Sequence, residues 1–132
     1  WNIKNKNYFV SAFAANDPDS TFKVWNLIKN KFNNKICFFL NTRDDRRYRT
    51  IQLIDLVFHR INPDLFIVRG NNIKNDIDKY DVSTKVKLFS MDSSCDEIIN
   101  YIISLNNYTI IGIGNIVGWG DTFLEKLKNH KV

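Results

Sequence analysis

The chain has 132 residues, of which 44% are hydrophobic, and ten are phenylalanines. This length and composition favour one folded domain with a substantial core and argue against intrinsic disorder. Its net charge is +5, but the lysines are spread along the chain and no nucleic-acid-binding motif is present, so we do not expect nucleic-acid binding. No apolar run approaches the roughly 18 residues of a membrane span, so we do not expect membrane insertion either.

The amino-terminal part predicts one strand followed by one helix. Residues 1–7 are polar after Trp1, and we interpret them as a polar leader or as the boundary of a piece cut from a longer protein. The folded domain is then expected over 8–132, and the apolar run at 8–14 predicts its first strand. Turn residues at 16–20 offer N-cap side chains for a helix that ends near 33–34. The apolar face of this helix is Phe22, Trp25, Ile28 and Phe32.

The rest of the chain alternates between strands and helices. Asn62-Pro63 ends one helix, because proline disfavours helix at the residue before it. Ser94 and Glu97 form a capping box for another. The strand pattern at 85–89 alternates, which is typical of a strand nearer an edge. The predicted strands are 36–40, 65–68, 85–89 and 109–113, and the predicted helices are 51–60, 73–80 and 119–129, with a further helix that follows Ser94 and carries Ile98, Ile99, Ile102 and Ile103 on one face.

Strands separated by helices of this length predict βαβ units. We therefore expect a three-layer, Rossmann-like α/β domain with a mainly parallel sheet of about five to six strands. The runs at 36–40, 65–68 and 109–113 are continuously apolar, as strands covered on both faces should be. Cys37 lies in one of these runs and Cys95 near a helix start; neither belongs to a C-x-x-C motif, so both are expected to be free thiols.

Four of the six arginines lie between residues 43 and 49, directly after a predicted strand and before a predicted helix. Ligands of open α/β sheets bind at such carboxyl-end turns, and the guanidinium fork fits phosphate or carboxylate. The turn therefore predicts an anion-binding segment. An alternative is a solvated turn in which Asp44 and Asp45 neutralise the arginines. The candidate binding residues of this turn are Arg43, Asp45, Arg46, Arg49 and Thr50.

A glycine-dotted turn at 112–120 is expected at the same edge of the sheet, together with Asn71 and Asn72. It resembles a phosphate loop without being G-x-G-x-x-G, because Val117 stands where the third glycine should be. The alternative is a tight turn that allows close packing of a helix on a strand. The further candidates at this edge are Asn16, Asp17, Gly112, Gly114, Asn115 and Gly118.

Three segments, 13–21, 41–50 and 112–118, also carry a family resemblance. In this order and at this spacing they resemble the poly-γ-glutamate synthases of the PgsB/CapB type, over nearly the whole chain from Tyr8 onward. That family is similar to Mur ligases and folylpolyglutamate synthase, in which an ATP-binding central domain precedes a Rossmann-like C-terminal domain. The chain looks like that C-terminal domain.

The resemblance implies a part of an ATP-dependent amide ligase that joins glutamate residues through γ-amide bonds. The γ-carboxylate would be activated as an acyl phosphate and attacked by the amine of the incoming glutamate, while this domain closes the active site and positions ATP and anionic substrate. By position, Asp45-Arg46 matches the Asp-Arg of the Mur Gly-Asp-Arg-Asp motif. Asn16 stands where the Mur Asp-Tyr-Ala-His-Asn-Pro motif has its histidine, and Phe13 replaces that motif's aspartate.

The resemblance further implies ATP and Mg²⁺ as cofactors of the full-length enzyme, at the cytoplasmic face of the bacterial membrane. Its implied partners are an upstream ATP-binding domain, glutamate, poly-γ-glutamate and membrane-associated synthase subunits. The chain has no P-loop and no carbamylated-lysine or Mg²⁺ segment, so no catalytic or metal-ligating residue is assigned and the fragment alone is expected to be inactive. The alternative from another class is a non-catalytic α/β regulatory module that binds a nucleotide or phosphate.

Overall fold

The computed structural model describes residues 1–132, and its centre is a six-stranded sheet in the order β1-β2-β6-β3-β4-β5. Strand β1 runs antiparallel to β2, and all other neighbours are parallel. The predicted three-layer α/β domain with a mainly parallel sheet is thus confirmed. The strands are β1 (Asn2–Ile3), β2 (Asn7–Ser11), β3 (Lys35–Asn41), β4 (Leu65–Arg69), β5 (Lys85–Phe89) and β6 (Tyr108–Gly114).

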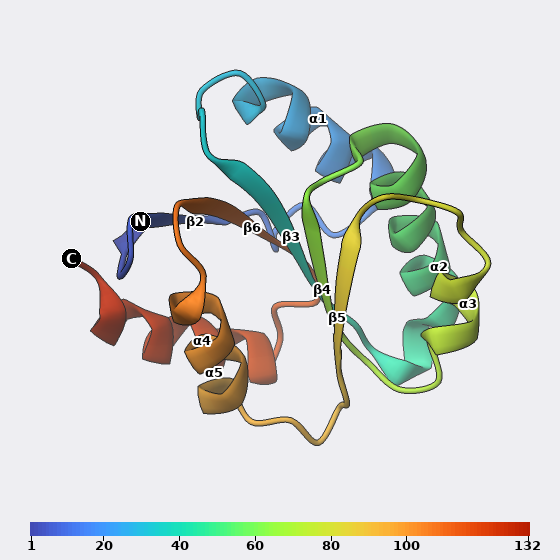
Figure 1. The fold of residues 1–132 in the computed structure, drawn as a ribbon. Helices are drawn as coiled ribbons and strands as arrows, with labels where there is room; N and C mark the ends of the chain where they lie inside the picture. The colour runs from blue at the N-terminus through green and yellow to red at the C-terminus, as the bar shows by residue number, and fades with distance from the viewer.

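Five α-helices cover the two faces of the sheet. Helices α1, α2 and α3 lie on one side, and α4 and α5 lie on the other (Figure 1). None of them is both long enough and apolar enough to cross a membrane. The helices are α1 (Pro18–Ile28), α2 (Arg47–Leu56), α3 (Lys74–Asp78), α4 (Cys95–Ser104) and α5 (Trp119–Leu127).

Each face of the sheet has its own hydrophobic core. Phe38, Leu40 and Val68 point into the core beneath α1 to α3. Phe39 and Ile67, their neighbours along β3 and β4, point into the core beneath α4 and α5. Because side chains alternate along a strand, both faces can be buried only if both sets are apolar, which explains the continuous apolar runs in the sequence. The central strands are therefore fixed by apolar burial on both sides.

The first seven residues differ from the predicted polar leader. Strand β1 pairs with β2, and Ile3 is only 1% exposed. Asn7 is equally buried, and its side chain donates to the Leu105 carbonyl at 2.8 Å and accepts from the Tyr108 backbone N–H at 2.8 Å. A buried amide with its hydrogen bonds satisfied is part of a fold, so this stretch belongs to the folded domain.

Element boundaries shift at three further places. Strand β2 ends at Ser11 although the apolar residues continue to Ala14. Helix α1 ends at Ile28, one turn before Phe32, whose ring packs against Tyr8 outside the helix. The helix predicted at 51–60 begins earlier, at Arg47 of α2, directly after a 3₁₀ turn (Asp44–Arg46), and it ends in a π-helical turn (Val57–Ile61). The predicted strand at 85–89 is an edge strand, as expected.

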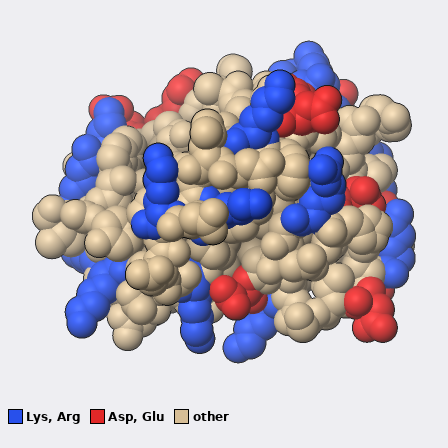
Figure 2. All heavy atoms as spheres, turned by 90° about the horizontal axis from the view of Figure 1, so that it is seen from above, with Lys and Arg blue, Asp and Glu red and all other residues tan.

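On the face shown in Figure 2, lysine and arginine side chains are separated by neutral surface and by acidic side chains. This face does not present the continuous basic stripe that is typical of a nucleic-acid-binding surface. The net positive charge is scattered over it.

Cys37 is completely buried in β3, and burial raises the pKa of its thiol far above the ordinary value. Because the thiolate is the reactive form, we expect this thiol not to react with a labelling reagent in the native chain and to react once urea unfolds it. The measurement is thiol titration of a Cys95→Ser variant, in which Cys37 is the single cysteine. Rapid labelling under native conditions would show that β3 is not the covered strand described above.

Candidate functional site

A polar pocket lies where β3 and β6, neighbouring parallel strands, end side by side. The chain leaves β3 toward α2 on one face of the sheet and leaves β6 toward α5 on the other. Such divergent connections open a crevice outside the carboxyl ends of the strands. We call it the arginine pocket; its hollow is open to solvent and spans about 360 Å³. It is lined by Asn16, Leu40, Asn41, Thr42, Arg43, Arg46, Arg49, Thr50, Leu53, Gly114 and Asn115.

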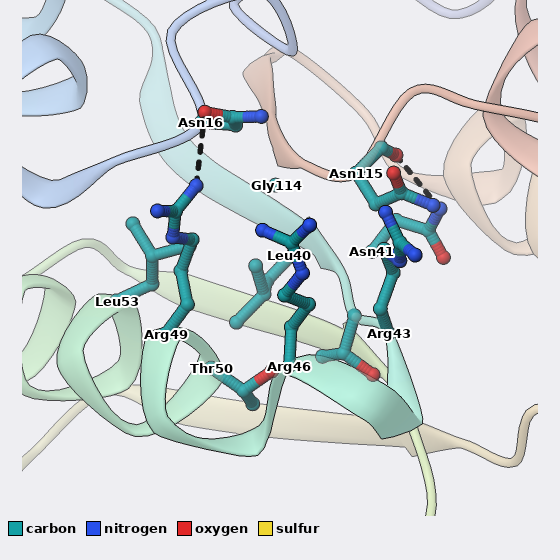
Figure 3. A pocket seen from close by; sticks show the side chains of 11 residues that line it. Asn16, Leu40, Asn41, Arg43, Arg46, Arg49, Thr50, Leu53, Gly114 and Asn115 are labelled. Atoms are coloured by element: carbon teal, nitrogen blue, oxygen red, sulfur yellow. Dashed lines mark hydrogen bonds between the residues drawn. The ribbon is translucent and has the colours of Figure 1, made fainter.

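Three of the clustered arginines point into this pocket from the turn after β3 and the first turn of α2 (Figure 3). The Arg49 guanidinium donates to Asn16 Oδ1 at 3.4 Å, a long hydrogen bond. Arg46 forms neither an ion pair nor a side-chain hydrogen bond within the chain. Arg46 therefore presents a guanidinium whose five donors are free for a ligand.

Arg43 is held by a carboxylate on its own turn. Its Nε and Nη2 atoms donate to the two carboxylate oxygens of Asp45 at 2.9 and 2.8 Å. These hydrogen bonds hold the pKa of the Asp45 carboxyl below its usual value. Both side chains are well exposed, so the pair adds little to stability. The pair orients Arg43. Neutralisation by an aspartate, which the alternative of a solvated turn expects, is found within this turn for Arg43.

The fourth arginine of the cluster points elsewhere. Arg47 donates to Asp76 Oδ2 on α3 at 2.5 Å and to the Asn72 carbonyl at 3.2 Å. It lines an adjoining hollow with Asn71 and Asn72, which shares Thr42, Arg43 and Thr50 with the arginine pocket. The structure thus divides the four arginines into three pocket residues and one that ties α2 to α3.

No aspartate or glutamate lines the arginine pocket. Arg46 and Arg49 have no carboxylate partner, whereas Asp45 neutralises part of the charge of Arg43. The pocket keeps a positive potential, and a recessed site with low-dielectric walls concentrates that potential. Leu40 and Leu53 provide the apolar part of the wall. The arrangement suits phosphate or carboxylate groups, which guanidinium binds through two parallel hydrogen bonds. It does not suit Mg²⁺, which prefers carboxylate oxygens.

The opposite wall is built from Asn41, Gly114 and Asn115. Asn41 Nδ2 donates to the Asn115 carbonyl at 2.9 Å, and the Asn115 N–H donates to the Asn41 carbonyl at 2.8 Å. Gly114 has φ +95°, and a Cβ there would stand 2.3 Å from the Asn41 carbonyl oxygen. Glycine is therefore required at 114, because the end of β3 and the loop after β6 approach too closely for any side chain.

The other predicted candidates have structural positions outside the pocket. Gly112 is buried within β6, where the missing side chain makes room for the Phe13 ring. Gly118, with φ +71°, is the residue before α5. Asp17 caps α1 by accepting from the Ser20 N–H at 2.9 Å. The packing interpretation fits Gly112, whereas at Gly118 a Cβ would meet no neighbour and only the positive φ of a turn favours glycine. Asn16, Thr50, Gly114 and Asn115 do join the three arginines.

The capping role of Asp17 makes a stability prediction. Asp17→Ala is expected to lower the free energy of unfolding by about 1 kcal/mol at neutral pH. The Ser20 N–H lowers the pKa of this carboxyl. Its contribution is therefore complete above the ordinary carboxyl pKa and disappears as pH falls through the lower, folded-state pKa. Urea unfolding of both proteins between about pH 7 and pH 3 should show the difference shrinking.

Asp19→Ala, which removes an exposed first-turn carboxylate, is the control and should change stability by a few tenths of a kcal/mol. A constant Asp17 difference would contradict the capping role.

Sequence reasoning missed three residues of this edge: Asn41, Thr42 and Arg69. Asn41 and Thr42 line the pocket directly. Arg69 ends β4, is 6% exposed, and donates to Asn41 Oδ1 at 2.9 Å. The sequence offered one signal for Arg69: it is the single charged residue of an otherwise apolar strand, and it lies at the carboxyl end of that strand.

Comparison with known proteins gives one family and two named relatives. The family model for the poly-gamma-glutamate synthase CapB C-terminal domain matches residues 2–130. PGA synthase CapB from Bacillus subtilis (strain 168) is 31% identical over 132 residues, which cover 95% of this chain and 33% of the relative. Capsule biosynthesis protein CapB from Bacillus anthracis is 28% identical over 131 residues, covering 95% of this chain and 28% of the relative. The chain thus spans about a third of the length of these relatives.

A solved structure supports the fold independently. It is a domain of a Haemophilus ducreyi 35000HP protein assigned as a UDP-N-acetylmuramate:L-alanyl-gamma-D-glutamyl-meso-diaminopimelate ligase. The TM-score is 0.65 at 17% identity, and the alignment covers 96% of this chain and 93% of that one. The likeness confirms the predicted Mur ligase-like fold.

Proposed function

Because the chain belongs to the family of poly-gamma-glutamate synthase CapB C-terminal domains, we propose that it closes the active site of an ATP-dependent amide ligase. The full-length enzyme would join glutamate residues through γ-amide bonds, as in capsule synthesis. The family match favours this function over a free-standing regulatory module that binds a nucleotide.

The observation that carries the proposal is the arginine pocket, whose lining contains no carboxylate and in which Arg46 and Arg49 have no ion-pair partner. A ligase of this kind must gather the phosphates of a nucleotide and the carboxylates of two glutamate units in one place. Like charges repel, so their approach requires fixed cations at the interface that closes over them. Arg43, Arg46 and Arg49 provide three such cations at one edge of the domain.

Within this proposal each of the three pocket arginines has its own role. Arg46 binds an anionic oxygen directly, because its donors are free. Arg49, steered by Asn16, and Arg43, steered by Asp45, reach the same space from either side. ATP, when bound, supplies the phosphoryl group that activates the γ-carboxylate. The pocket suits its phosphates or the carboxylates of glutamate, whereas Mg²⁺ would be held by groups of an upstream ATP-binding domain.

The family also suggests where the full-length enzyme works. We propose an upstream ATP-binding domain in the same chain, glutamate and poly-γ-glutamate as ligands, and membrane-associated synthase subunits at the cytoplasmic face of the bacterial membrane. The length of the relatives, about three times that of this chain, leaves room for such an upstream domain.

The proposal is tested by dividing the full-length ligase. The 132-residue chain alone is expected to release no phosphate from ATP above the buffer rate, with or without glutamate, because it lacks a loop that cradles the nucleotide phosphates with a lysine. A ligase lacking residues 2–130 of this domain should still bind ATP but lose glutamate-dependent phosphate release. Steady glutamate-dependent release by either half alone would contradict the proposed division of labour.

A further inference from the structure

Arg69 is a buried arginine without a carboxylate partner. Its guanidinium lies over the Trp119 ring, 4.1 Å from the ring centroid. It donates from Nη1 to Asn41 Oδ1 at 2.9 Å and from Nη2 to the Met91 carbonyl at 2.7 Å. Its Nε is buried and has no hydrogen-bond partner. The side chain therefore connects the last residue of β3, the loop after β5 and the first residue of α5 at the edge that carries the arginine pocket.

A purely structural role explains this residue poorly. A buried charge with no opposite charge in contact costs stability, and an apolar side chain of similar size would usually serve the fold as well. Burial indeed lowers the pKa of the Arg69 guanidinium. Asp44 and Asp92 act on it only through space, because neither forms an ion pair with it. The reason for a guanidinium at this position is found in what it does to its neighbours.

The neighbour that matters is Asn41. A side-chain amide has one accepting end and one donating end, and a guanidinium can only donate. Because Arg69 donates to Asn41 Oδ1, the amide group of Asn41 must direct its Nδ2 toward the Asn115 carbonyl. Asn41 and Asn115 both line the arginine pocket, whereas Arg69 does not.

We infer that Arg69 is a positioning residue of the arginine pocket, which fixes the Asn41 amide and thereby holds the Gly114–Asn115 wall opposite Arg46 and Arg49. This inference rests on the proposed function, because it assigns a role within the same closed site. It adds a residue on β4 that touches no ligand and acts through Asn41.

The test is a double-mutant cycle in the full-length ligase, with glutamate-dependent phosphate release as the readout. Arg69→Met and Asn41→Ala are each expected to lower kcat/KM by about 10- to 100-fold, since a small misplacement of binding groups can cost roughly a hundredfold. If Arg69 acts through Asn41, the double variant should be no worse than the worse single variant. Arg69→Lys should keep part of the activity, because an ammonium group can also only donate hydrogen bonds, although it lacks the planar fork.

A control variant, an assay condition and a replacement cycle separate a positioning role from a loss of folding. Arg60→Met is the control, because Arg60 also stacks on an aromatic ring, that of Phe22. Arg60 lies before the amino end of β4, whereas Arg69 lies at its carboxyl end. The kcat/KM of Arg60→Met should remain within about twofold of the parent value. All assays are run well below the melting temperature of each variant. If Arg69→Met does not fold, the cycle of Arg69→Lys with Asn41→Ala replaces it under the same criterion.

Unchanged kcat/KM in the folded Arg69 variant, or losses that multiply in the double variant, would overturn the inference. A merely structural Arg69 would lower the melting temperature and leave kcat/KM intact. A separate result would overturn the proposed function: normal glutamate-dependent phosphate release by the Arg46→Ala ligase. Loss of turnover in Arg46→Ala with normal turnover in Arg69→Met would leave the proposed function standing and remove only the positioning role.

Discussion

Replacing Arg46 with alanine in the full-length ligase is expected to lower glutamate-dependent ATP turnover by about a hundred- to a thousand-fold, which corresponds to roughly 2.7–4 kcal/mol of lost transition-state stabilisation. The fold should stay intact, because the Arg46 guanidinium makes no contact that holds the chain together. Arg46→Lys should restore only part of the rate, since lysine keeps the charge but loses the planar fork. The measurements are kcat/KM and melting temperature for each variant.

Two outcomes would count against this expectation. Near-normal turnover in Arg46→Ala would mean that the turn is a solvated surface segment, in which a single substitution changes stability by no more than about 0.5 kcal/mol. A collapsed melting temperature would instead make Arg46 a structural residue. In either case the arginine pocket would lose its role in the proposed ligase.

Phe123→Ala is expected to lower the free energy of unfolding by about 3–5 kcal/mol, because it opens a cavity in a packed core. Phe123 is completely buried on α5. Its ring stacks on Trp119 at 5.3 Å between centroids and lies 5.1 Å from Phe39 on β3. Domains of this size are stable by only about 5–15 kcal/mol, so the variant should unfold at a much lower urea concentration.

Tyr48→Ala is the control for this cavity. Tyr48 is 77% exposed on α2, and its removal should change stability by no more than about 0.5 kcal/mol. Urea unfolding of the 132-residue chain measures both variants. Equal and small losses in the two would show that α5 does not pack on β3 as described.

The sequence was sufficient for the features that depend on local pattern. The apolar runs at 36–40, 65–68 and 109–113 predicted covered strands, and all three lie at the centre of the sheet. Ser94 caps α4 through the Glu97 N–H, as the capping box predicted. The turn after β3 was recognised as an anion-binding candidate because the arginines follow a buried strand, and three of them do line one pocket.

Features that depend on long-range pairing could not be predicted. The insertion of β6 between β2 and β3 brings Asn115 to Asn41, although 74 positions separate them along the chain. The polar composition of the first seven residues concealed β1, because Trp1 and Ile3 are the only apolar residues there. The order of the arginines in the sequence does not predict that Arg47 pairs with Asp76 while Arg46 has no ion-pair partner. Arg69 directly follows the predicted strand 65–68 and carries no prediction from the sequence; its role appears only through its contact with Asn41.

The most direct test compares two adjacent arginines in the full-length ligase. Arg46 faces the arginine pocket without a partner, whereas Arg47 lies outside it and pairs with Asp76. The two alanine variants remove the same charge from the same turn, so a general electrostatic effect would change both rates alike. We predict that kcat/KM for glutamate-dependent phosphate release falls at least about a hundredfold in Arg46→Ala and stays within about threefold of the parent value in Arg47→Ala. Equal losses in the two variants, or none in either, would contradict the assignment of the arginine pocket as the anion-binding site of the closed enzyme.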